Sequence, residues 1–370
     1  MKRFAGMLLA AACCIAAQQT QAHSENAITR LLNSKASGSV RGYADAAAEV
    51  AKEAEKGRAV HAYVLALVSM MPSPPPAAKL DEATRRKYLD GCRDKIKKLA
   101  DEKNNSMALY LLALEGNDRD LMHRAADAGN VQALNAWGTY LVTGGVDAAA
   151  ADTNEVNRIL GVAFEYFKKA AAQNDANGLY NLGMCHLRGL GTPRDDQSAF
   201  SNFRAAAEKG HPEAINNIGL FFREGRVVNK DPELSAKWFE KSASYENPYG
   251  QFNYALALQH GEGVAKDEAK AVEYLKKAAD GGCVEAVDAY GVALWKGRGI
   301  KEDAKAAFGM FRIAAENGYP PAMENLSTCY RLGKGVKADE RKSIEWKIRS
   351  RAVRGDRNAQ AWLEQNARRK

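Results

Sequence analysis

The feature that most constrains the fold is a repeat: small residues, glycines and aspartates recur every 36 residues from Gly183 to Asp339. Three columns of the repeat are, in register, Gly183, Gly219, Ala255, Gly291 and Ser327; Gly189, Gly225, Gly261, Gly297 and Gly333; Asp195, Asp231, Asp267, Asp303 and Asp339. A chain of 370 residues would otherwise suggest two or three globular domains. A fixed period of this length indicates instead one structural unit that stacks on copies of itself.

Each repeat unit reads as a helical hairpin. In residues 212–223, apolar side chains at Ile215, Ile218 and Phe222 form one helical face. Gly225 then supplies the left-handed conformation that ends a helix, and Asp231 followed by proline is typical of a helix start. A small residue inside the first helix, such as Gly219, indicates close packing against a neighbouring helix. The sequence therefore predicts an all-α solenoid of hairpins about 36 residues long.

The repeat becomes less regular toward the N-terminus. We expect an N-terminal helical region at 23–104, with one degenerate repeat, a Pro-rich linker at 72–76 and a charged helix at 79–103. The solenoid is expected to span 105–356, with an insertion loop at 146–154. A basic closing helix or tail is predicted at 357–370.

These columns resemble the Sel-one-like repeat (SLR), a relative of the tetratricopeptide repeat. The pattern is clearest from Tyr254 to Asp267, followed by Ala271, Tyr274 and the stretch 277–282. The resemblance is specific over about 174–355 and implies an all-α, right-handed α/α superhelical solenoid whose concave face binds protein partners. It implies no single activity. The chain departs from the pattern at Val227, where a loop glycine is missing, and at Ala255 and Ser327.

The first 22 residues have the pattern of a secretory signal peptide. Met1-Lys2-Arg3 is basic, an apolar run follows from Phe4 to Ala17, and small residues precede a cleavage site after Ala22. A retained N-terminal anchor is one alternative. A lipoprotein using Cys13 or Cys14 is another, although alanines stand where a bulky aliphatic residue is expected. We expect a periplasmic or secreted protein whose mature chain has no transmembrane segment.

The patterns that point to catalytic or metal chemistry have simpler explanations. The Gly-x-Gly loops lie between predicted helices rather than after a strand, so they are interpreted as turns. The aspartates lie one to a hairpin and are expected to cap helices. The histidines include no pair at ligand spacing. We therefore expect no metal, no cofactor and no catalytic site. A β-lactamase, as described for cysteine-rich relatives, is disfavoured because no serine begins a Ser-x-x-Lys motif.

Four cysteines remain after the first 22 residues, at Cys92, Cys185, Cys283 and Cys329. Their irregular spacing favours buried free thiols, although an exported protein could also pair them.

The partner-binding face can be predicted from the register. If Gly183 is the eighth position of a tetratricopeptide-like first helix, the fifth and twelfth positions should face the groove. These columns vary in chemistry, whereas the structural columns do not. The predicted groove residues are Tyr180, Asn216, Phe252, Asp288 and Glu324 at the fifth position, and Leu187, Arg223, Gln259, Trp295 and Arg331 at the twelfth. Trp295 and Arg331 are the strongest candidates, since Trp and Arg are enriched in binding hot spots.

Two functions are compatible with the sequence. The first is an exported, non-enzymatic scaffold that binds a protein or peptide in the groove. The second is attachment to an anionic surface such as lipid, polysaccharide or nucleic acid, although nucleic acid is not favoured. Residues 341–370 contain ten Lys or Arg and three Asp or Glu, which gives this end +7 of the chain's +8. A polar cap on the last repeat would explain the same charge. Two N-glycosylation sequons, at Asn104 and Asn325, leave a eukaryotic secretory-pathway adaptor open.

Overall fold

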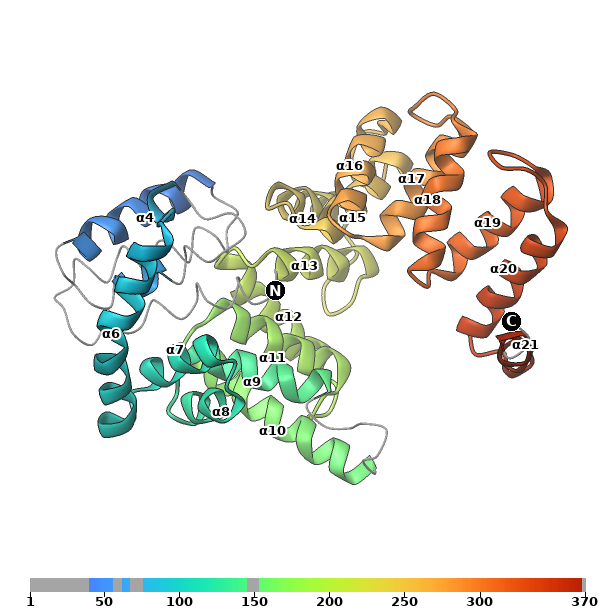
Figure 1. Cartoon of the computed structure of the whole chain (residues 1–370). Coiled ribbons are helices and arrows are strands. Elements are labelled where there is room, and N and C mark those ends of the chain that lie inside the picture. The colour runs from blue at the N-terminus through green and yellow to red at the C-terminus, as the bar shows by residue number, and fades with distance from the viewer. Residues whose placement is uncertain (1–39, 56–61, 67–75, 145–152, 368–370) are drawn as a thin grey trace. The chain divides into compact units, whose positions relative to one another are not determined.

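The computed structural model describes residues 40–55, 62–66, 76–144 and 153–367, and within these ranges the regular structure is helical (Figure 1). The chain forms two compact units, one ending at Ala214 and the other beginning at Ile215. The first unit contains α4 (Val40–Glu55), the 3-10 helix η1 (Pro76–Ala78), α6 (Glu82–Lys103), α7 (Ser106–Gly116), α8 (Arg119–Asp127), α9 (Val131–Thr143), α10 (Thr153–Ala172), α11 (Ala176–Arg188) and α12 (Asp196–Glu208). The boundary lies within α13 (Pro212–Glu224). The second unit continues with α14 (Pro232–Ser244), α15 (Pro248–His260), α16 (Glu268–Asp280), α17 (Val284–Lys296), α18 (Ala304–Glu316), α19 (Pro320–Leu332), α20 (Glu340–Val353) and α21 (Arg357–Ala367).

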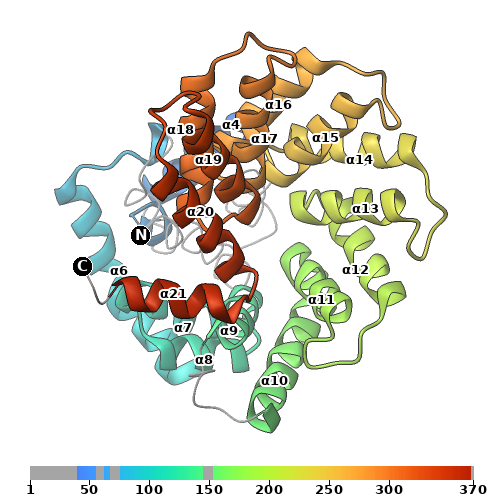
Figure 2. The same ribbon diagram turned by 90° about the vertical axis from the view of Figure 1, so that its right-hand side faces the viewer.

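The predicted helical hairpins are present. Helix α15 packs on α16, α17 on α18 and α19 on α20, and each hairpin also contacts the next through α16 on α17 and α18 on α19. Figures 1 and 2 show these hairpins of the second unit side by side. In the first unit α11 packs on α12 in the same way. The all-α solenoid class predicted from the repeat is confirmed.

Several predicted N-terminal features lie partly or wholly outside the described residues. These are the segment 1–22, most of the Pro-rich linker and most of the loop at 146–154. The charged helix predicted at 79–103 is α6, and the closing helix predicted from residue 357 is α21.

The aspartate column caps the second helix of each hairpin, as predicted. In every case the carboxylate accepts a backbone N–H from the first turn, for example from Leu234 at 2.9 Å in α14. The caps are Asp195, Asp231, Asp267, Asp303 and Asp339. Each such cap stabilises its helix by about 1 kcal/mol. The glycine column six residues earlier takes positive φ values where the first helices end.

A close contact between a glycine and an aromatic ring joins the two helices of a hairpin. A Cβ on Gly219 would lie 2.6 Å from the Phe239 ring, and Gly183 with Phe203 and Gly291 with Phe311 show the same approach. In the repeat where the glycine is Ala255, the position of the ring holds Leu275, and both side chains belong to one buried cluster. At Ser327 the hydroxyl instead donates to the Ser343 carbonyl at 2.8 Å. The departure at Ala255 is therefore matched by a change in the facing helix, and the departure at Ser327 adds a hydrogen bond to that helix.

The loop glycine missing at Val227 has a different role. At the corresponding Gly263, φ is +70°, and a Cβ would lie 1.9 Å from the carbonyl oxygen of Pro232 at the start of α14, the second helix of the preceding hairpin. Gly299 makes the same close approach to the carbonyl of Glu268. Val227 keeps a left-handed φ of +66° although its side chain is β-branched, a strained combination.

The contact between Gly219 and Phe239 predicts a non-additive pair of substitutions. Gly219→Ala should lower the free energy of unfolding by about 1 kcal/mol, because overpacking outweighs the gain in helix propensity. Adding Phe239→Leu should recover part of the loss, since it recreates the pair of Ala255 and Leu275. Urea titrations measure both effects.

Gly309 in α18 is the matched control, because a Cβ there would meet nothing within 4 Å. Gly309→Ala should raise the free energy of unfolding by up to about 1 kcal/mol. If Gly219→Ala stabilises the protein equally, the close contact does not limit packing.

Candidate functional site

The predicted groove residues lie in three different environments. Asn216 and Asp288 are buried, Tyr180, Arg223, Phe252, Gln259 and Trp295 are half-buried, and Arg331 is exposed. Of the two further members of these columns, Leu187 is half-buried and Glu324 is exposed. Tyr180 stacks on His211 with ring centroids 4.4 Å apart. The role of these residues in partner binding stays a prediction, but their surroundings narrow which of them a partner can reach.

The buried pair lies in a polar ladder between successive first helices. Asn216 is 7% exposed and its Oδ1 accepts from Nδ2 of Asn253 at 2.8 Å. Two repeats later, Asp288 is 8% exposed and accepts from Asn325 at 2.8 Å. These side chains join one hairpin to the next, because each buried polar group needs a hydrogen-bond partner.

The same ladder occurs in the first unit, where Asn181 donates to Asn135 at 3.1 Å. In all three contacts, a side chain at the fifth position of one repeat accepts from an asparagine at the sixth position of the next.

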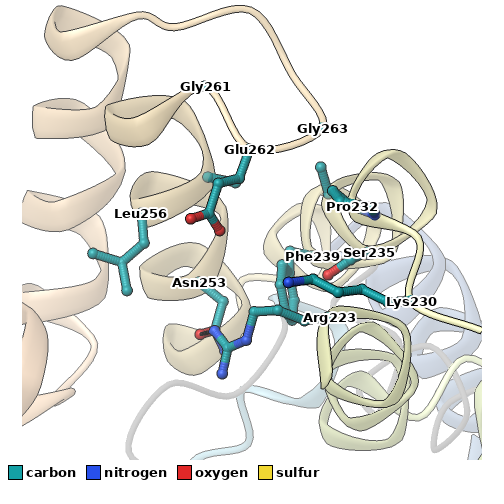
Figure 3. A pocket seen from close by; sticks show the side chains of 12 residues that line it. Arg223, Lys230, Pro232, Ser235, Phe239, Asn253, Leu256, Gly261, Glu262 and Gly263 are labelled. Atoms are coloured by element: carbon teal, nitrogen blue, oxygen red, sulfur yellow. Dashed lines mark hydrogen bonds between the residues drawn. The ribbon is translucent and has the colours of Figure 1, made fainter. Parts of the chain in front are cut away.

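A cleft opens beside this ladder in the second unit (Figure 3). Its volume is about 320 Å³. The cleft lies between α14 and α15, and its wall includes Arg223, Lys230, Phe239, Leu256 and Glu262. Nη1 of Arg223 donates to Oδ1 of Asn253 at 3.0 Å, and its guanidinium lies 5.6 Å from the centre of the Phe239 ring. We call this the first cleft.

A second cleft repeats the first one repeat later along the chain. Its volume is about 210 Å³, and most of its wall consists of residues 36 positions after those of the first cleft. Gln259 replaces Arg223, Leu275 replaces Phe239, and Arg298 replaces Glu262. Leu256 lies in the wall of both clefts.

The next register along the chain is filled by its own side chains. Trp295, in the place of Arg223, packs near Phe311 with ring centroids 6.1 Å apart. Lys334 lies 4.3 Å above the Trp295 ring and pairs with Glu302 at 2.8 Å. Trp295 is therefore engaged within the protein, whereas Arg331 forms no hydrogen bond or ion pair within the described ranges.

Leu256 was not among the residues predicted from the sequence. It belongs to the column that directly follows the small residue, and the four members of this column in the second unit are half-buried: Leu220, Leu256, Val292 and Thr328. The sequence did indicate this column, because it is mostly apolar and lies between two predicted groove positions. The first helices are apolar at many other positions, so this column could not be distinguished from the core.

The four described cysteines are free and buried. Burial raises the pKa of the Cys185 and Cys329 thiols to about 11 and that of Cys283 to about 12. The pKa of Cys92 is also raised by burial. Among the described residues no group of three or more His, Cys, Asp or Glu side chains has a geometry that could hold a metal ion. No described helix is both long and apolar enough to span a membrane.

The family model of the Sel1 repeat matches the chain in six consecutive segments: residues 155–175, 176–211, 212–244, 248–283, 284–319 and 320–346. No curated protein sequence matches.

Several solved structures are similar to this one. A Sel1 repeat protein from Oxalobacter formigenes is 25% identical with a TM-score of 0.53, and the match covers 70% of this chain and 96% of that one. The protective antigen c5321 of uropathogenic Escherichia coli, which displays an SLR fold, is 24% identical with a TM-score of 0.42, covering 88% and 76% of the two chains. Helicobacter pylori cysteine rich protein B is 24% identical with a TM-score of 0.30, covering 35% and 94%.

The burial of Asp288 predicts a pH-dependent loss of stability. Burial raises the pKa of this carboxyl above its ordinary value of 3.8, although the bond from Asn325 opposes the shift. The folded state then holds the proton more tightly than the unfolded state, so stability falls as the pH rises from 3.8 through the raised folded pKa. Asp288→Asn should remove this dependence. It should also raise the free energy of unfolding at pH 7 by about 1 kcal/mol, because the amide pair of Asn216 and Asn253 is recreated.

Urea titrations at several pH values measure the effect of Asp288→Asn. Asp94→Asn on the exposed surface of α6 is the control and should change neither quantity. A less stable Asp288→Asn protein at pH 7 would show that the carboxylate is required in the ladder.

The buried cysteines predict slow thiol chemistry in the folded protein. At pH 8, a chain of residues 23–370 prepared without reductant should react with an aromatic disulfide reagent only after denaturation, because the thiolate is the reactive form. Four thiols should then be counted. A lower count after denaturation would indicate a disulfide.

Proposed function

The chain belongs to the Sel1 repeat family, and from this premise we propose that it is an exported, non-enzymatic scaffold that binds a protein partner. Solenoids of this kind commonly act as protein-interaction scaffolds, because stacked repeats create an extended surface of similar sites. Export rests on the signal-peptide pattern of residues 1–22, and the periplasm or the extracellular space is its destination.

The observation that carries the proposal is the repetition of one cleft in two successive registers. Each cleft combines an apolar wall with polar groups, and Leu256 is shared between them. An extended chain segment can place one side chain in each cleft, whereas a single small molecule would occupy only one of them. The partner surface we propose comprises Arg223, Leu256, Gln259, Asp288 as part of the second wall, and Arg298.

Site-specific photocrosslinking in the native compartment tests this surface. A benzophenone side chain at Leu256 should give discrete crosslinked products, which mass spectrometry then identifies. The same probe at Lys276, on the exposed side of α16, is the control and should give none. Equal products from both positions, or none from Leu256, would contradict the proposed surface.

Two further measurements bear on the same proposal. N-terminal sequencing of the exported protein should begin after Ala22, and recovery of Met1 would contradict cleavage. Hydrolysis of nitrocefin by the purified chain above the blank would contradict a non-enzymatic role.

A second candidate function is attachment to an anionic surface through 341–370. The exposed face of α20 supports it, because Arg341, Ile344 and Lys347 form one stripe and Ile344 is 49% exposed. Several neighbouring cations are engaged in ion pairs with carboxylates, namely Lys342, Arg349, Arg351 and Arg354. Binding to vesicles with 30% anionic lipid that is lost at high salt and in Arg341→Gln/Lys347→Gln would favour this function.

A further inference from the structure

We propose that the first cleft takes an acidic side chain, Asp or Glu, of a peptide segment that lies across the face of the repeats. This inference rests on the proposed function and specifies which chemistry the partner brings to one of its two clefts. It follows from the polar groups of the cleft and from their comparison with the closed register at Trp295.

Arg223 is held in place before any ligand arrives. Its guanidinium donates to Asn253 at 3.0 Å, and Asn253 is fixed in turn by Asn216 at 2.8 Å. The Phe239 ring supports the guanidinium from one side. A guanidinium has five N–H donors, and the bond to Asn253 uses one of them. The remaining donors are available to a carboxylate, the acceptor that the planar guanidinium fits best.

Two charged side chains flank the cleft and make no ion pair within the described ranges: Lys230 and Glu262. Figure 3 shows Glu262 descending from the loop at Gly261 and Gly263, while Arg223 and Lys230 enter from the other side. In the closed register the same two positions hold Glu302 and Lys334, which are paired at 2.8 Å across Trp295. The open cleft therefore has two cations and one carboxylate, an excess of positive charge.

This arrangement matches a peptide better than a free anion. A carboxylate side chain can meet Arg223 and Lys230, while a backbone N–H of the same segment donates to Glu262. A small inorganic anion gains the first contact but also meets the repulsion of Glu262.

Selection from a phage-displayed library of random 12-residue peptides on the full mature chain tests the inference. Selected peptides should be enriched in Asp or Glu at one position. Replacement of that residue by Gln or Asn in synthetic peptides should weaken binding about tenfold, as expected for a charge-assisted hydrogen bond. Sodium phosphate should weaken peptide binding no more than sodium chloride does at the same ionic strength.

Variants of the protein assign the effect to the cleft. Arg223→Gln should weaken binding of the acidic peptide about tenfold, and Glu262→Gln should strengthen it several-fold, since it removes repulsion but keeps an acceptor. Lys276→Gln, on the exposed side of α16 and outside the cleft, is the matched control and should have no effect. If Arg223→Gln does not fold, Lys230→Gln replaces it, because the Lys230 side chain is exposed, and weakened binding is again expected.

The outcomes separate the inference from the proposed function. Peptides without acidic enrichment, or acidic peptides insensitive to both Arg223→Gln and Lys230→Gln, would overturn the inference while leaving a peptide-binding scaffold intact. Failure to select any peptide would overturn the inference and, together with absent crosslinks from Leu256, the proposed function.

Discussion

The close approach of two helices at a glycine is the constraint on which the rest of the structure depends. At Gly219 the first helix contributes no side chain, so the Phe239 ring of the second helix lies directly against its backbone. This contact fixes how the first helix lies on the second, and it recurs at Gly183 with Phe203 and at Gly291 with Phe311. The substitution pair of Ala255 and Leu275 shows that volume at the contact is conserved when its residues change.

With the hairpins fixed, the contacts between them determine where the surface is open. At three junctions a contact of the polar ladder joins successive first helices, as where Asn216 and Asn253 share a buried hydrogen bond. The other side remains accessible where the residue at the twelfth position does not fill it. Arg223 turns toward Asn253 and leaves a cleft, whereas Trp295 covers its junction and is itself covered by Lys334.

The skeleton of the fold could be predicted from the sequence because each element rests on a local rule. An aspartate before a helix or a glycine after one has the same effect in every repeat, and the structure confirms both columns. The environment of the groove residues could not be predicted in this way. Asn216 and Asp288 vary between repeats as surface residues do, but their partners lie 37 residues later, at Asn253 and Asn325. A change of residue type along one column therefore does not distinguish an exposed stripe from a buried polar contact whose two members change together.

The positions of Arg223, Lys230 and Glu262 influence both whether a cleft is open and which charge it carries. At the mouth, the pair is Lys230 and Glu262 in the first register and Glu302 and Lys334 in the closed one, so a reversal of sign accompanies the change of Arg223 to Trp295. A lysine above an indole is stabilised by the ring and can also reach the facing glutamate, which closes the junction. A glutamate above a guanidinium that is already bound to Asn253 leaves Lys230 without a partner. In a repeat protein whose skeleton hardly changes, these three exchanged side chains are among the differences between an open cleft and a closed junction.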